Sequence, residues 1–101
     1  MLRSENYKTT RFYFEPLKER VLIECWGAYG GQIGFQHRAN VFLNGNFTPY
    51  KNKFYKVQYY NRTWEKYQFE SLLIHVLNSL LKDKEITQEE YEQFKNEVVN
   101  G

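Results

Sequence analysis

Residues 33–45 have the sequence Ile-Gly-Phe-Gln-His-Arg-Ala-Asn-Val-Phe-Leu-Asn-Gly, and they alternate between apolar and polar side chains more clearly than any other segment of the chain. Successive side chains of a strand point to opposite sides, so the alternation predicts a strand over residues 33–43 with one face in a core and the other mostly in water. Asn44-Gly45 follows directly and supplies the two positive-φ positions of a type I′ turn, which predicts that the chain reverses there.

The segments on either side of this strand complete a predicted antiparallel sheet. Residues 10–15 and 21–26 show the same alternation, and three glycines among residues 27–31 predict a reversal after the second of these strands. The last strand is predicted over residues 53–60. Residues 46–48 are either a short piece of ladder or part of a long loop, because the proline that follows them cannot donate a ladder hydrogen bond.

After Thr63 the apolar residues recur at intervals of three and four, which predicts helices. The first helix is predicted over residues 63–82, with Thr63 as its N-cap. The second is predicted over residues 88–99, where Thr87 and Glu90 have the spacing of a capping box. The stripe by which the first helix would face a core consists of Phe69, Leu72, Leu73, Val76, Leu77 and Leu80.

The predicted fold class is therefore α+β, with an antiparallel β-meander of about four strands followed by a C-terminal two-helix hairpin that packs on one face of the sheet. A chain of 101 residues has the length of one domain, so we expect a single domain over residues 1–101. The sheet would occupy residues 10–60 and the helices residues 63–82 and 88–99.

The composition argues against several classes of protein. One cysteine cannot form an internal disulfide, and together with two histidines it falls one ligand short of the usual structural zinc set, so we expect no metal and no cofactor. No apolar run approaches the roughly 18 residues of a membrane span, and the first residues lack the apolar segment of a secretory signal. A cytoplasmic protein that does not enter the membrane is expected.

Catalysis has few candidate residues. Cys25 and His37 fall on adjacent predicted strands and could pair as a thiol nucleophile and its base, while His75 falls on the polar side of the long helix. No third group is in place to orient the base, and the glycines of residues 27–34 are not followed by the lysine of a phosphate loop. The sequence therefore predicts that the protein is not an enzyme.

Residues 50–67 combine five basic residues and one acidic residue with seven aromatic ones. A strand with an aromatic core face accounts for some of these rings. Basic groups interleaved with aromatic rings are also typical of single-stranded nucleic-acid sites and of protein–protein hot spots. The predicted partner-binding residues are Tyr59, Tyr60, Arg62 and Trp64, with Lys51 and Lys53 steering the partner by their charge.

The small net charge of +2 conceals an uneven distribution. Residues 1–81 carry a net charge of +5, whereas residues 82–101 carry −3. We therefore expect a basic body joined to an acidic C-terminal helix, with the acidic side chains in solvent.

Residues 61–71, Asn-Arg-Thr-Trp-Glu-Lys-Tyr-Gln-Phe-Glu-Ser, open a predicted helix. Over residues 60–81 the chain resembles small accessory proteins of phages and conjugative elements of low-GC Gram-positive bacteria. The resemblance implies a non-enzymatic inhibitor that binds a host protein stoichiometrically in the host cytoplasm, as anti-CRISPR and other anti-defence proteins do. Direct nucleic-acid binding by a basic aromatic sheet face is the alternative, and a homodimer could bury surplus aromatic residues of an open sheet.

Overall fold

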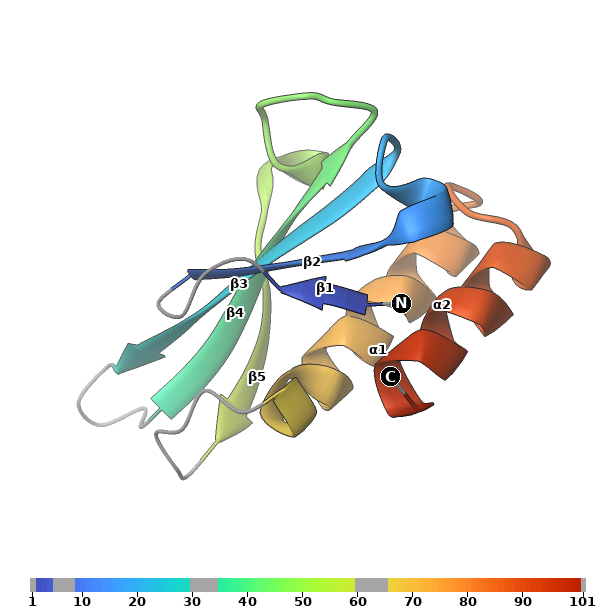
Figure 1. Ribbon diagram of the computed structural model, residues 1–101. Helices are drawn as coiled ribbons and strands as arrows, with labels where there is room; N and C mark the ends of the chain where they lie inside the picture. Colours follow the sequence, from blue (N-terminus) through green and yellow to red (C-terminus); the bar gives the residue numbers. More distant parts are fainter. Residues whose placement is uncertain (1, 5–8, 30–34, 60–65, 101) are drawn as a thin grey trace.

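The computed structural model describes residues 2–4, 9–29, 35–59 and 66–100, and within these ranges the side chains of residues 11–26, 37–57 and 69–100. The described part forms an antiparallel meander sheet followed by two helices that contact each other and the sheet (Figure 1). The predicted α+β class is confirmed. The elements are β1 (Leu2–Ser4), β2 (Thr9–Phe14), η1 (Glu15–Leu17), β3 (Val21–Tyr29), β4 (Phe35–Leu43), η3 (Tyr50–Asn52), β5 (Tyr55–Tyr59), α1 (Lys66–Lys82) and α2 (Gln88–Asn100).

The order of the strands in the sheet is their order in the chain, β1-β2-β3-β4-β5. The edge strand β1 is the one described strand that the sequence did not predict, and it pairs with β2 through Leu2 opposite Phe14. Three residues are too few for an alternating pattern to stand out from the sequence around them. β3 and β4, with nine residues each, are the longest strands and lie side by side in the inner part of the sheet.

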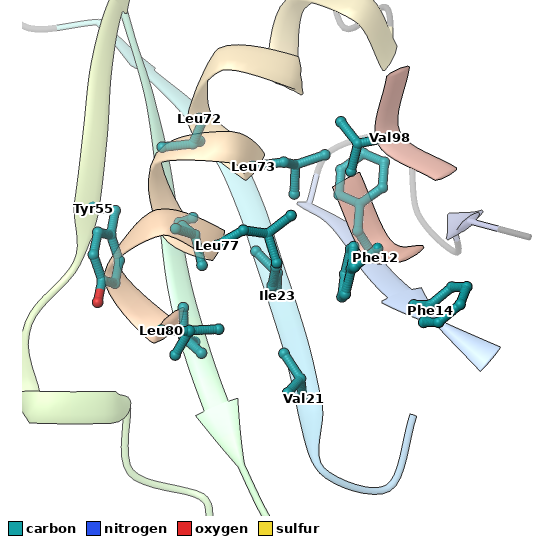
Figure 2. Packing of buried hydrophobic residues seen from close by; sticks show 14 of the residues in the cluster. Phe12, Phe14, Val21, Ile23, Tyr55, Leu72, Leu73, Leu77, Leu80 and Val98 are labelled. Carbon is teal, nitrogen blue, oxygen red and sulfur yellow. The ribbon is translucent and has the colours of Figure 1, made fainter. Parts of the chain in front are cut away.

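The helices lie on one face of the sheet, and the core fills the space between the two layers (Figure 1). All six residues of the predicted stripe on α1 have no more than trace exposure, and Figure 2 shows several of them directed at Phe12, Val21 and Ile23 of the strands. The second helix adds Tyr91, Phe94 and Val98 to the same core. Burial of each such side chain contributes about 1.5–3 kcal/mol, so this contact is the main stabilising interaction of the fold.

The predicted end of the strand over residues 21–26 is wrong because strand pairing overrides local sequence signals. β3 does not stop at Trp26 but continues through Gly27 to Tyr29, and Gly27 pairs with His37 of β4. Glycine is a weak strand former, but a neighbouring strand that is itself nine residues long extends the ladder past it. The predicted reversal at residues 27–31 therefore begins too early, and residues 30–34 lie outside the described part.

The Asn-Gly turn forms as predicted but does not start a tight hairpin. Asn44 and Gly45 have φ values of 56° and 74°, and the amide of Asn46 donates to the carbonyl oxygen of Leu43 at 3.0 Å. The chain then forms a loop rather than a ladder over residues 46–48, and β5 begins at Tyr55. This long β4–β5 loop reaches beyond the end of the sheet (Figure 1).

The second helix begins at the predicted cap. The backbone amide of Glu90 donates to the Thr87 hydroxyl at 3.1 Å, and the amide of Thr87 donates to the Glu90 carboxylate at 2.9 Å, so the capping box is confirmed. Ile86 and Tyr91, which flank this box in the sequence, are both buried. The N-cap predicted at Thr63 lies outside the described residues, and α1 is described from Lys66.

The stability of the fold should depend on the α1 stripe far more than on exposed apolar residues. Leu77→Ala leaves a cavity in the core and should lower the free energy of unfolding by about 2–5 kcal/mol in urea titrations followed by circular dichroism. Val99→Ala, at a position that is 52% exposed on α2, is the matched control and should change it by less than about 0.5 kcal/mol. Equal effects of the two variants would contradict the packing described here.

Candidate interaction surface

The face of the sheet opposite the helices, called the open face below, carries the polar half of each alternating strand. Its described side chains are exposed or half-buried, in contrast to those of the covered face. Within the part of the chain whose side chains are described, no helix or strand packs over it. The side chains of the open face are Arg11, Tyr13, Leu22, Glu24, Trp26, Arg38, Asn40, Phe42 and Lys56.

A row of three residues crosses the open face. Trp26 of β3 lies opposite Arg38 of β4, and Arg38 lies opposite Lys56 of β5. Phe54, just before β5, is 45% exposed and completes the group, because its ring meets Trp26 edge-on at 6.3 Å and Arg38 lies over it at 5.0 Å. We call Trp26, Arg38, Phe54 and Lys56 the aromatic-basic patch.

The charged members of the aromatic-basic patch are both cations, Arg38 and Lys56. Glu24 of β3 is an acidic residue on the same face. Its carboxylate accepts a hydrogen bond from Arg11 at 3.1 Å. The acidic residues of α2 belong to the helical layer behind the sheet. The uneven charge of the sequence is thus distributed over two sides of the molecule, and the aromatic-basic patch is suited to an acidic surface.

A shallow pocket of about 420 Å³ occupies the other end of the open face. Leu22 and Phe42, which pair across β3 and β4, form much of its apolar lining. Phe47 of the β4–β5 loop borders it and is 99% exposed. The charged residues on its rim are Arg11, Lys18, Glu19, Arg20 and Glu24.

The two lysines predicted to steer a partner lie on the β4–β5 loop. Lys53 lies over the Tyr55 ring at 5.0 Å and is exposed. Lys51 is exposed as well, but its amino group lies 2.6 Å from Asp83 in the turn between the helices. The Tyr50 hydroxyl donates to the same carboxylate at 3.0 Å. Lys51 therefore helps to attach the loop to the helical layer.

These contacts shift the ionisation of the three groups. The hydrogen bond from Lys51, followed by that from Tyr50, lowers the pKa of Asp83 below its ordinary value, and the same ion pair raises the pKa of Lys51. Burial, with the hydrogen bond to Asp83 as a second cause, raises the pKa of Tyr50 to about 12. The tyrosine accordingly remains a hydrogen-bond donor at neutral pH.

The other predicted partner-binding residues fall at the edge of the described chain. Tyr59 ends β5 and pairs through its backbone with Phe35. Tyr60, Arg62 and Trp64 lie outside the described residues, in the connection from β5 to α1. Their role stays a prediction.

The sequence analysis missed Trp26, Arg38 and Phe47 as candidate site residues. Trp26 and Arg38 could have been found, since both occupy the solvent side of strands whose alternation is clear, and a tryptophan on that side is unusual. Phe47 gives no such signal, because a single aromatic residue in a loop is as compatible with burial as with exposure.

The structure provides little for catalysis among the described residues. Burial, with the nearby charge of Glu24 as a second cause, raises the pKa of the Cys25 thiol, which disfavours the thiolate needed for nucleophilic attack. His37 is fully buried with its ring stacked on Phe69 at 4.5 Å, and His75 is exposed on α1 with Tyr55 against it edge-on.

In the described ranges, no group of three or more metal-ligating side chains comes together, and none of the described helices is long and apolar enough to cross a membrane.

Comparison with known proteins adds no assignment. A scan against protein-family models finds no match, and searches of curated proteins and of solved structures find none either. The geometry of the open face and the sequence are therefore the observations that bear on function.

Burial of the single cysteine can be tested directly with a thiol reagent. Cys25 is fully buried, so we expect the native protein to react with an aromatic disulfide reagent far more slowly than the protein unfolded in urea. Absorbance of the released thiolate measures both rates. Rapid labelling of the native protein would contradict the described position of Cys25.

The contacts of Asp83 predict a dependence of stability on pH. A carboxyl group whose pKa is lowered by folding stabilises the native state above its unfolded pKa, and this contribution is lost as the pH falls through the lower, folded value. Asp83→Asn should therefore reduce the free energy of unfolding at neutral pH, and its difference from the wild type should shrink below about pH 4. Urea titrations over this range provide the measurement, and a difference that does not depend on pH would contradict the prediction.

Proposed function

We propose that this chain is a small non-enzymatic binding protein that occupies the surface of a host protein, with the aromatic-basic patch at the centre of the contact. The row of Trp26, Arg38 and Lys56, with Phe54 packed against it, is the observation that carries the proposal. Aromatic rings and arginine are enriched among the residues that dominate binding energy at protein–protein interfaces. A partner surface with carboxylates next to an apolar depression would complement this patch.

The nature of the partner is proposed from the resemblance of residues 60–81 to accessory proteins of phages and mobile elements. Such a protein would inhibit or modulate a host defence protein, for example a CRISPR effector, by stoichiometric binding in the host cytoplasm. Tyr59, Tyr60, Arg62 and Trp64 follow the patch in the chain and would extend the contact from β5 towards α1. Lys53, exposed beside Tyr55, would contribute to long-range attraction of an acidic partner.

Binding of single-stranded nucleic acid is the second candidate, and it is favoured by the two cations of the patch lying beside two aromatic rings. The arrangement of the rings supports a protein partner instead. Arg38 lies over the Phe54 ring, and the edge contact between Phe54 and Trp26 occupies further ring surface. These contacts leave less ring face open for stacking of bases.

The proposal is tested by capturing the partner with patch variants. The tagged protein is incubated with nuclease-treated lysate of the host bacterium, and bound proteins are identified by mass spectrometry. Phe54→Ser and Lys56→Glu should each reduce capture of the partner by at least about tenfold, because each removes a central contact. Val99→Ser, at a half-exposed position in the helical layer, is the matched control and should retain it. Unchanged capture by both patch variants would contradict the proposal.

Two further measurements separate the alternatives. The double variant Trp64→Ala and Arg62→Ala should also weaken capture if the contact extends beyond β5. Fluorescence anisotropy with a single-stranded oligonucleotide at low salt tests the second candidate. For binding driven by phosphates, the logarithm of the association constant falls linearly with the logarithm of the salt concentration. Strong binding with that salt dependence, lost in Lys56→Glu, would favour the nucleic-acid function over the one proposed.

A further inference from the structure

Phe47 is the most exposed large apolar side chain that the structure describes, at 99%. It lies on the β4–β5 loop, where residues 44–50 carry no charged side chain. An aromatic ring in solvent forgoes the favourable free energy that its burial would supply, and such rings are common anchors of interfaces. The ring can therefore enter an apolar depression on another molecule without leaving any packing in its own fold.

A partly apolar pocket on the open face lies beside Phe47. The pocket of about 420 Å³ has apolar lining from Leu22 and Phe42, and Phe47 itself forms part of its border. Pockets that hold ligands in proteins begin at about 300 Å³, so the space is large enough for a phenyl ring. One patch of the surface thus contains both a projecting ring and a place to receive one.

We infer that this end of the open face binds a second copy of the chain, with Phe47 of each copy seated in the pocket of the other. A two-fold symmetric contact brings the same patch of both copies together. When the projecting ring and the pocket adjoin each other, the two halves of the contact form simultaneously and the assembly closes as a dimer. A ring and a pocket on distant faces would instead give a head-to-tail assembly, either a closed ring of subunits or an open filament.

The charges on the pocket rim favour a second copy over an acidic or basic partner. Glu19 and Glu24 offset the charges of Arg11 and Lys18, so two copies of this rim can meet without net repulsion between these groups. The remaining rim cation, Arg20, donates to the Glu90 carboxylate of α2 at 2.5 Å and to the carbonyl oxygen of Glu85 at 2.9 Å. Its charge is therefore paired with the helical layer.

The aromatic-basic patch contains two cations, Arg38 and Lys56, and no carboxylate among its members, so it suits an acidic surface better than a second copy of itself. Its nearest member, Trp26, lies four residues along β3 from Leu22, or about 13 Å. Glu24 of the pocket rim lies between Leu22 and Trp26, so the two contacts adjoin on β3 but are centred on different residues. Variants at Phe47 and Phe54 therefore test them separately.

Sedimentation equilibrium over about 1 µM to 1 mM tests the inference, because this range covers weak and moderate self-association. The wild type should change from one chain mass of 12.3 kDa towards twice that value. Phe47→Ser should raise the dissociation constant by at least about 30-fold, as expected for loss of an aromatic hot spot, with an unchanged circular dichroism spectrum. Phe54→Ser, which removes an exposed ring of the other patch, is the matched control and should dimerise like the wild type.

A mixing experiment distinguishes ring-in-pocket contact from a general loss of association. Leu22→Glu places a charge in the pocket and should also abolish the homodimer. Mixed with Phe47→Ser, it should form a heterodimer, because its intact Phe47 can enter the intact pocket of the other variant. A wild type that remains monomeric at the highest concentration, dimerisation of Phe47→Ser equal to that of the control, or failure of the two variants to associate when mixed would overturn the inference.

Discussion

The burial of the α1 stripe against the inward face of the sheet is the contact on which the rest of the structure depends. It covers one side of every strand from β2 to β5 and leaves the other side without a covering element among the described residues. The same alternation that places Ile23 and Val41 in the core also places Trp26 and Arg38 on the open face. The core and the candidate interaction surface are therefore two outcomes of one pattern in the sequence.

Much of this architecture could be predicted because the signals were local and repeated. The alternation of residues 33–43, the stripe of α1 and the capping box of Thr87 and Glu90 each depend on spacing within a single element. The errors arose where a neighbouring strand decides the outcome. Gly27 stays in the ladder because β4 is present to pair with it, which no local pattern reveals.

The candidate site was predictable only in its general character. The sequence indicated basic and aromatic residues near β5, and Lys53 and Phe54 do lie there. It could not indicate that Trp26 would join Phe54, since 28 positions separate them in the chain and only the register of three strands brings them together. Lys51 shows the converse. The sequence suggests a charge that steers a partner, but the Lys51 amino group forms an ion pair with Asp83 within the chain.

The meander order of the sheet also bears on how the molecule assembles. Each described strand pairs with its neighbour in the chain, and no connection crosses from one side of the sheet to the other. Contacts between segments close in sequence require little loop closure before they form, which favours rapid folding. The helices come last, so a nascent chain exposes the apolar face of its sheet until α1 is complete. During synthesis, the window between β5 and the end of α1 is therefore the period in which this protein is most exposed to aggregation.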